Sequence, residues 1–226
     1  KVDNTTADAE IANKTDVVLT SVAGNEKAIG YISLGALNDT VKAVKVDGAE
    51  ATVDNVKAGA YKLSRPFNIA TKGEPTGVAK DFISFILSKE GQAVVTDNKY
   101  IAVNDAAESF VSDGSSGQIA VGGSSSVSPV MEKLIEAYKS VNPNASIDLQ
   151  TSDSTSGMTG AMDGTFAIGM ASRELKDEEA AQLTGTAIAL DGIAVIVNPA
   201  NTIDELSMDQ IKSIYVGDIT DWGDLA

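Results

Sequence analysis

The second half of the chain alternates short apolar runs with longer stretches in which apolar residues recur at helical spacing. A small polar turn separates each apolar run from the helical stretch after it, which is the pattern of strand, turn and helix repeated. Such alternation predicts a parallel or mixed α/β sheet. The predicted strands are 118–122, 146–150 and 166–171, and the helices that follow them are 128–140, 157–163 and 177–183.

The first half is less regular, and its predicted elements are shorter. Its composition predicts a helix, then three strands around polar turns, and then two helices. Phe82, Phe85 and the neighbouring Ile83 and Ile86 form a broad apolar surface that we expect to pack in the core. In chain order, the predicted ranges are 5–14 for the first helix, 16–20, 28–34 and 42–46 for the strands, and 77–87, capped by Thr76, and 90–95 for the other helices.

Two further helix starts carry recognisable signals. Ser128 followed by Pro129 is typical of an N-cap and first-turn pair. Ser207 and Gln210 form a capping box for a helix that runs to about Tyr215.

Three serine-rich turns stand between the strands and helices of the second half, at 122–129, 151–158 and 169–175. Each turn carries hydroxyls beside the first residues of a helix, where backbone N–H groups have no partner within the helix. Hydroxyls and free N–H groups together hold small oxyanions. One serine- and glycine-rich turn alone is ordinary loop chemistry. Three in succession predict an anion site.

Composition narrows the classes of function. The 226 residues, 43% of them hydrophobic, suffice for one large domain or two lobes. The formal charge of −15 argues against nucleic-acid or anionic-membrane binding, because both rely on clustered Lys and Arg. Without histidine there is no Ser-His-Asp triad, and without cysteine there is no disulfide or thiolate metal site. The lack of cysteine fits an extracytoplasmic protein.

The serine turns and their neighbours resemble the phosphate-binding protein of the bacterial ABC phosphate importer, a type II periplasmic-type solute-binding protein. GQIAVGGSSSVSPVMEKLIEAY from Gly117, KYIAVNDAAES before Phe110 and DITDWGDL at 218–225 carry the resemblance. In that family the first stretch opens the mature chain and the second closes it. The two halves therefore stand here in circularly permuted or tandem-boundary order, and we expect residues 112–117 to be the linker between them.

The resembled family continues after its counterpart of 218–225 with a strand and a Ser-Gly-Thr-Arg type loop. That loop gives the anion several backbone donors and an arginine. We find no such segment in this sequence, where it would fall between Ala226 and Lys1. Its absence predicts weaker anion binding.

The resemblance implies an α/β fold of the two-lobed type II periplasmic-binding-protein kind, with mixed sheets and a cleft between the lobes. Two hinge crossings, at 61–70 and 189–197, join the lobes, and closure is a hinge motion through them. One lobe then comprises 64–190, with the linker inside it. The other lobe is discontinuous and comprises 1–63 and 191–226.

The resemblance also assigns the anion ligands turn by turn. Each turn supplies a serine hydroxyl, and the first adds the backbone N–H of Val127. Two further hydroxyls lie close enough in sequence to contribute, and the third turn adds an arginine. The predicted ligands are Ser125, Ser126, Val127, Ser154, Thr155, Ser172 and Arg173.

Arg173 stands where many relatives in that family have aspartate. An aspartate can accept the proton of hydrogen phosphate and so reject sulfate, whereas an arginine offers a charged, two-pronged donor. We expect Arg173 to bind the anion directly and a different acceptor, Asp153, to discriminate against sulfate. The alternative for Arg173 is a surface ion pair with Glu174 or Asp177.

The acidic stretch at 218–225 is a weaker candidate for a binding site. Asp218, Asp221 and Asp224 recur every three residues, but they lack the spacing, the central glycine and the final glutamate of an EF-hand. The resemblance makes this stretch a surface turn, in which Trp222 either packs or faces the cleft.

The leading interpretation is a non-enzymatic protein that captures inorganic phosphate, without a cofactor, and delivers it to the membrane subunits of an ABC permease. The resemblance implies an extracytoplasmic location, at the cell surface or in the periplasm, with a membrane anchor on the full-length lipoprotein. A serine phosphatase is the enzymatic alternative, but histidine and a Gly-x-Ser-x-Gly elbow are missing. The third alternative is a permuted or swapped scaffold module, a domain-swapped homodimer with weak or no anion binding.

Overall fold

The computed structural model describes residues 4–225, and these form two compact units. Unit 1 contains the chain up to Leu63 together with the chain from Ile193 onward, and unit 2 is Ser64–Gly192. The chain therefore passes from one unit to the other twice, at the start of β4 (Ser64–Thr71) and within β8 (Thr184–Val197). None of the helices in the described part combines the length and the apolar character needed to cross a bilayer.

Unit 2 contains five strands of a mixed seven-stranded sheet, and the alternating pattern predicts a sheet of the parallel or mixed kind. Its other strands are β5 (Gly117–Ser124), β6 (Ala145–Ser152) and β7 (Ile168–Ala171), and the order across the sheet is β8-β4-β7-β5-β6. β5 is parallel to both β6 and β7, while β4 is antiparallel to β7 and to β8. The strands that carry the serine turns are thus neighbours that run in the same direction.

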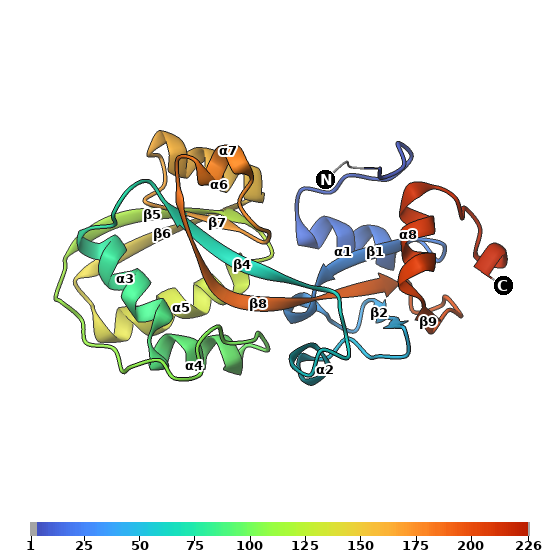
Figure 1. Cartoon of the computed structure of the whole chain (residues 1–226), viewed down its shortest axis with the longest axis horizontal. Helices are drawn as coiled ribbons and strands as arrows, with labels where there is room; N and C mark the ends of the chain where they lie inside the picture. The colour runs from blue at the N-terminus through green and yellow to red at the C-terminus, as the bar shows by residue number, and fades with distance from the viewer. Residues whose placement is uncertain (1–3, 226) are drawn as a thin grey trace. The chain divides into compact units, whose positions relative to one another are not determined.

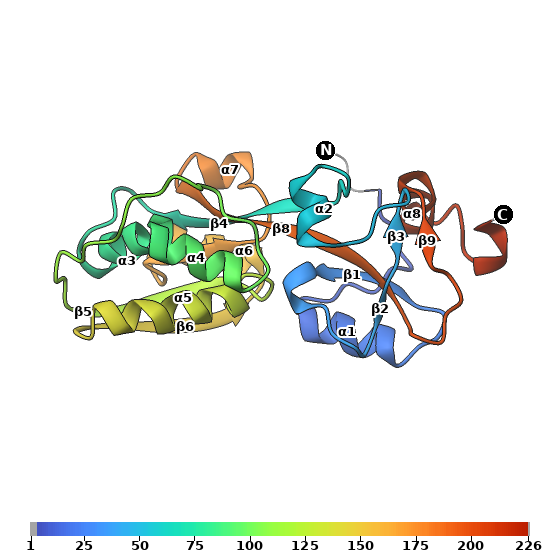
Figure 2. The same cartoon turned by 90° about the horizontal axis from the view of Figure 1, so that it is seen from below.

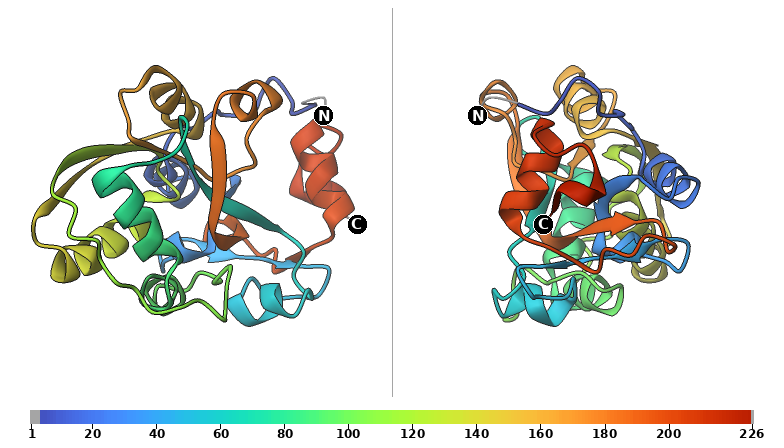
Figure 3. Two further views of the ribbon diagram at one scale, coloured as in Figure 1. Left: turned by 60° about the vertical axis from the view of Figure 1, so that its left-hand side comes forward. Right: turned by 90° about the vertical axis from the view of Figure 1, so that its right-hand side faces the viewer.

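Helices cover both faces of this sheet (Figures 1 and 2). α3 (Gly77–Leu87), α4 (Lys89–Asp97) and α5 (Ser128–Val141) pack in one hydrophobic core with strand residues such as Ile69. α6 (Ser154–Asp163) and α7 (Asp177–Ala180) lie over the other face, where Met158 and Ala161 of α6 contact Ala70. Figure 3 shows the two groups of helices on either side of the strands. Phe82 and Phe85 are fully buried, as predicted.

Most predicted elements of unit 2 are confirmed, but two helix starts differ. α6 begins at Ser154, three residues before the predicted start, because Asp153 caps it and draws the serines into the first turn. Ser128 is the first residue of α5 and not its N-cap, and its hydroxyl donates to the Ser124 carbonyl at 3.2 Å. α7 ends at Ala180, earlier than predicted.

Unit 1 contains a smaller set of strands. β1 (Ile29–Ser33) and β2 (Lys42–Ala43) both pair antiparallel with the last residues of β8. β3 (Lys45–Val46) pairs in parallel with β9 (Glu205–Leu206). The predicted strand at 42–46 is therefore split, since Val44 still donates to Val195 while Lys45 turns to Asp204. The remaining elements are α1 (Thr15–Ala23), η1 (Leu34–Ala36), α2 (Val53–Lys57), α8 (Met208–Val216) and η2 (Trp222–Leu225).

The helix predicted at 5–14 and the strand predicted at 16–20 are wrong. The described residues before Thr15 form turns and bends, and α1 occupies the range predicted as a strand. Val18 and Val22, one helical turn apart, both lie directly over Gly30 of β1. This packing outweighs the strand preference of the local valines.

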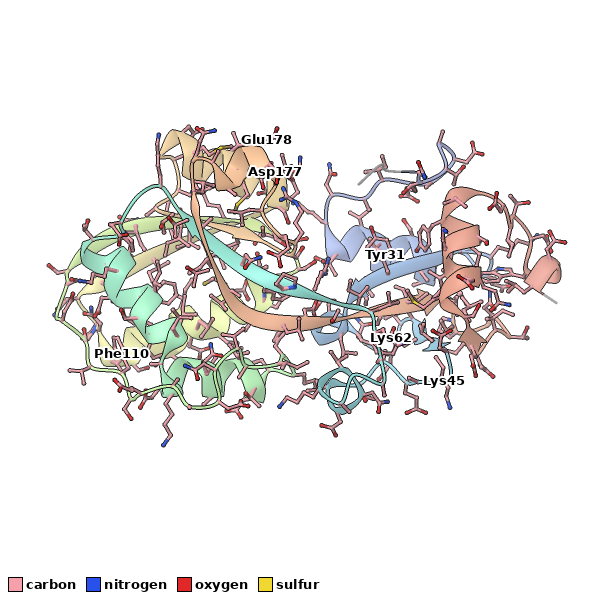
Figure 4. All side chains as sticks on the ribbon, in the orientation of Figure 1. Tyr31, Lys45, Lys62, Phe110, Asp177 and Glu178 are labelled. Atoms are coloured by element: carbon pink, nitrogen blue, oxygen red, sulfur yellow. The ribbon has the colours of Figure 1, made fainter. Side chains whose placement is uncertain are left out.

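The capping box at the start of α8 is confirmed. Gln210 N–H donates to the Ser207 hydroxyl at 3.1 Å, and the Gln210 side chain accepts from the Ser207 N–H at 2.8 Å. Further along, Trp222 donates its indole N–H to the Lys27 carbonyl at 3.1 Å, so its polar edge is bonded within unit 1. Figure 4 shows Tyr31 on β1 of the same unit, where its ring meets Tyr215 edge to face.

The linker at 112–117 is fastened to unit 2 by a buried carboxylate. Asp81 of α3, only 3% exposed, accepts from the hydroxyl of Ser112 and from the N–H of Asp113. Tyr138 and Asn142, at the end of α5, donate to the same carboxylate at 2.7 and 3.1 Å. Burial alone would raise the pKa of Asp81, but these hydrogen bonds together lower it. The carboxylate therefore holds Ser112 and Asp113 in place shortly before the start of β5.

Two glycines let α6 approach the sheet closely. Gly123, near the end of β5, has φ of 136°, and a side chain there would meet the Met170 carbonyl and the Gly157 Cα. A Cβ on Gly157 of α6 would in turn lie 2.7 Å from the Gly123 Cα. The two backbones touch because neither residue has a side chain. This contact places the first turn of α6 beside the ends of β5 and β7.

Candidate anion site

The three serine turns meet at one edge of the unit 2 sheet. Ser124, the last residue of β5, lies opposite Ser152, the last residue of β6, and Gly123 lies opposite Met170 near the end of β7. Parallel neighbouring strands end at the same edge, and ligands of open α/β sheets bind outside those carboxyl ends. The spatial gathering of the three turns, which the sequence predicts, is present.

The first turn joins β5 to α5 and bonds largely to itself and to the second turn. The N–H of Val127 donates to the Ser124 carbonyl at 3.0 Å, and its side chain is fully buried. The N–H of Ser126 points to the Ser124 hydroxyl at 3.3 Å, while that of Ser125 donates to the Ser152 carbonyl at 3.0 Å. Ser125 and Ser126 are both partly exposed. The donor expected at Val127 is thus used within the turn.

The second turn is the capped start of α6. Asp153 accepts from the N–H of Ser156 at 3.0 Å and from its hydroxyl at 2.7 Å. These bonds lower the pKa of Asp153 and keep the carboxylate ionised at neutral pH, so that it can only accept hydrogen bonds. Ser154 and Thr155 occupy the first helical turn, where Ser154 is half-buried and Thr155 is exposed.

The third turn follows β7 and holds an ion pair. Both terminal nitrogens of Arg173 donate to the carboxylate of Glu179, at 2.7 and 2.8 Å. Glu179 lies on α7 and is 2% exposed, whereas Asp177 and Glu178 on the same helix are exposed and visible in Figure 4. The partner of Arg173 is therefore a buried carboxylate, and the surface pair with Glu174 or Asp177 is not formed.

Direct hydrogen bonds connect the second and third turns. The N–H of Ser172 donates to the Ser154 hydroxyl at 3.1 Å, and the two hydroxyls lie 3.5 Å apart. Arg173 reaches the Thr155 hydroxyl at 3.4 Å. Four of the predicted ligands thus form one connected cluster. Ser125 joins the first turn to the end of β6, so all three turns are linked through the backbone.

The electrostatic balance at the third turn is close to neutral. Hydrogen bonding to Glu179 raises the pKa of Arg173 against the effect of burial, and the charges of Glu179, Asp153 and Glu178 raise it further. The same pairing lowers the pKa of Glu179. Both groups are ionised at neutral pH, and the arginine charge is matched by the buried carboxylate. Hydroxyl and N–H dipoles, with the start of α6, are the remaining attraction for an anion.

Two residues at this site were missed from the sequence. Asn68 of β4 follows a break in strand register after Phe67, and its side-chain amide donates to the Arg173 carbonyl at 3.0 Å. Its signal was a single polar residue in an otherwise apolar, buried run. Glu179 was hidden in an acidic stretch, where nothing local tells a buried carboxylate from exposed ones.

The described residues contain no group of three or more acidic side chains placed to hold a metal ion. The stretch at 218–225 therefore carries no such cluster in the part of the chain that the structure covers.

A family profile described as "PBP superfamily domain" matches residues 3–90 and 109–226. Together with the strand-end turns of unit 2, this match defines the class of protein as a solute-binding domain of that superfamily.

The chain belongs to the family of PstS phosphate-binding proteins within this class. It is 51% identical to "Phosphate-binding protein PstS 2" of Streptococcus agalactiae over 228 residues, covering 100% of this chain and 78% of the relative. It is 49% identical to the protein of that name from Streptococcus pneumoniae, covering 98% of this chain and 76% of that one. A crystal structure of a phosphate-binding protein of a phosphate ABC transporter from Streptococcus pneumoniae superimposes with a TM-score of 0.77, at 48% identity, over 100% of this chain and 88% of the other.

Proposed function

We propose that the chain captures inorganic phosphate at the strand-end site of unit 2 and serves an ABC phosphate importer. The observation that carries the proposal is the cluster of Ser154, Ser172, Thr155 and Arg173, joined by hydrogen bonds where three parallel strands end. Relatives at 51% and 49% identity are named phosphate-binding proteins, which supports phosphate as the anion. The importer is supported by the name of the solved relative.

The proposed ligands differ in how they become available. The hydroxyls of Ser126, Ser154 and Ser172 are the primary donors, with Ser125, Thr155 and the N–H of Val127 beside them. The Val127 N–H must share or leave its bond to the Ser124 carbonyl. Arg173 is proposed to donate the hydrogen that now points toward Thr155, since this is the longest of its hydrogen bonds.

Loss of a single serine hydroxyl is expected to weaken phosphate binding. Ser126→Ala, Ser154→Ala and Ser172→Ala should each raise the Kd for phosphate roughly 10- to 100-fold, because hydrogen bonds to a charged ligand contribute about 1.5–3 kcal/mol. Titration calorimetry of ligand-stripped protein measures this. Ser146→Ala, an exposed serine near the other end of β6, is the matched control and should leave the Kd unchanged. Native affinity in all three variants would refute the site.

Selectivity between phosphate and sulfate tests the roles of Arg173 and Asp153. Arg173→Ala should weaken the binding of both phosphate and sulfate about tenfold or more. The lost charge-assisted donor serves either anion, whether or not the anion carries a proton. Asp153→Asn keeps a good N-cap for α6 but offers less acceptor capacity. Asp153→Asn should therefore weaken phosphate binding and bring the affinities for phosphate and sulfate closer together. Unchanged phosphate and sulfate affinities in both variants would exclude these roles.

The proposal extends to where the protein acts and which partner it serves. We propose an extracytoplasmic binding protein, membrane-anchored in its full-length form, that delivers phosphate to permease subunits without catalysing a reaction. The names of the relatives support the transport role. The permuted order of the two halves stays a prediction. So does a domain-swapped homodimer, although a linker held by the buried Asp81 restricts the freedom that swapping needs.

A further inference from the structure

The guanidinium of Arg173 is held from one side by Glu179, and we propose that Glu179 is the positioning residue of the anion site. It fixes Arg173 so that one N–H faces the first turn of α6, ready for the ligand. This inference rests on the proposed function and adds a residue that no serine turn contains.

The geometry of the pair is that of a two-pronged clamp. Nη1 of Arg173 lies 2.7 Å from Oε2 of Glu179, and Nη2 lies 2.8 Å from Oε1. Two parallel bonds fix the plane of the guanidinium as well as its position. Glu179 is itself fixed, because its Oε2 also accepts the N–H of Lys176 at 2.8 Å. The clamp therefore has little freedom to turn.

The clamp leaves one weakly used hydrogen on the terminal nitrogens of Arg173. Each terminal nitrogen of arginine carries two hydrogens, and one of each is given to Glu179. The second hydrogen of Nη1 goes to the Glu174 carbonyl at 3.0 Å. The second hydrogen of Nη2 points toward the Thr155 hydroxyl, at the longer distance of 3.4 Å. An anion at the start of α6 can take this hydrogen while both bonds to Glu179 stay intact.

The charge of Glu179 makes the inference testable, because positioning and simple charge balance predict opposite results. Glu179 is 2% exposed and neutralises Arg173 at close range. If charge alone mattered, removing the carboxylate would leave Arg173 uncompensated and would tighten anion binding. If Glu179 positions Arg173, the same change frees the guanidinium and weakens binding.

Two conservative variants separate shape from charge. Glu179→Gln keeps the shape, but its amide offers one acceptor and turns a donor toward Arg173. Glu179→Asp keeps the charge, but its shorter side chain cannot hold both nitrogens in place. We expect both variants to weaken binding of inorganic phosphate roughly 10- to 100-fold. Unchanged or tighter binding in either folded variant would overturn the inference.

A double variant shows whether Glu179 acts through Arg173. Arg173→Lys removes the two-pronged donor, so adding Glu179→Gln to it should cost no further affinity. Additive losses would mean that Glu179 acts by another route and would overturn the inference. Glu136→Gln, which breaks an exposed ion pair on α5, is the matched control and should bind like the native chain.

Nitrogen-15 NMR of the arginines gives a readout that does not depend on binding. Arg65 and Arg173 are the two arginines of the sequence, and Arg65 pairs with Asp191, so it serves as an internal reference. Restricted rotation of the Arg173 guanidinium should be lost in Glu179→Gln while Arg65 is unchanged, and persistence would overturn the inference. If the native chain binds no phosphate, the proposed function fails and this inference falls with it. If the native chain binds phosphate and the Glu179 variants bind it equally well, this inference is wrong while the proposed function stands.

Discussion

Replacing Gly123 by alanine is expected to destabilise unit 2 by roughly 3–5 kcal/mol. Two costs add at this position. The φ of 136° is strained for any residue with a side chain, and the new Cβ would press on the Met170 carbonyl and lie 2.9 Å from the Gly157 Cα. Backbone atoms on β7 and α6 cannot rotate away as a side chain can. The strand end and the helix start must separate, so phosphate binding should weaken as well.

The two units allow this effect to be localised. Trp222 is the single tryptophan and lies in unit 1, so its fluorescence follows the unfolding of that unit, whereas far-ultraviolet circular dichroism follows both. Gly123→Ala should lower the urea concentration at the midpoint of the circular dichroism transition. The midpoint of the tryptophan fluorescence transition should not change. Gly164→Ala is the control, because its φ is 85° and a Cβ there would meet no atom within 4 Å apart from its neighbours along the chain. It should cost only about 1–2 kcal/mol. An equal loss of unfolding free energy in Gly123→Ala and Gly164→Ala would show that steric contact at Gly123 is unimportant.

Removal of the Asp81 carboxylate is the second large change, with an expected loss of about 3–4 kcal/mol in the free energy of unfolding. Asp81→Ala removes the acceptor of four hydrogen bonds, two from residues 112–113 and two from the end of α5, where Asn142 keeps its bond to the Ser115 carbonyl. Tyr138→Phe removes one of these donors and should cost about 1 kcal/mol. Urea unfolding followed by circular dichroism measures both. Because Asp81 lies at the far end of β5 from the serine turns, the phosphate Kd should not change in Tyr138→Phe.

The contribution of Asp81 also depends on pH. Its pKa is lowered in the folded chain, so its stabilising effect is present above the unfolded pKa of about 3.9 and is lost as the pH falls through the folded value. The difference in unfolding free energy between native protein and Asp81→Asn should therefore be constant from about pH 7 to pH 5 and shrink below about pH 4. A difference that stays constant to pH 2 would mean that Asp81 is not the titrating group.

The gathering of the three serine turns could be predicted from the sequence, but the contacts within and between the turns could not. The strand–turn–helix repeat predicted the sheet of unit 2, and parallel strands then bring the turns to one edge. It could not show that the Val127 N–H bonds to the Ser124 carbonyl, because that depends on how tightly the first turn closes. Nor could it distinguish Glu179 from the acidic residues around it. Which of these acidic side chains is buried depends on the path of the loop after β7.

The errors in unit 1 have a different physical origin. The valine-rich stretch that forms α1 has a local preference for strand, and it becomes helical because Val18 and Val22 fit over Gly30. That fit depends on how α1 folds back onto β1, which the local propensity of the valines does not reveal. The early start of α6 is the opposite case, since the cap Asp153 and the following serines are visible in the sequence, where serines are equally typical of a loop.

The hydrogen bond from the Ser172 N–H to the Ser154 hydroxyl has a consequence for the heat of binding. Together with the bond from Val127 to Ser124, it means that N–H donors beside the proposed site have partners within the protein. Capture is then an exchange of internal bonds for bonds to the ligand, and not a simple addition. The measured enthalpy should be smaller than the number of contacts in the bound state implies, and release of ordered water should provide much of the favourable free energy.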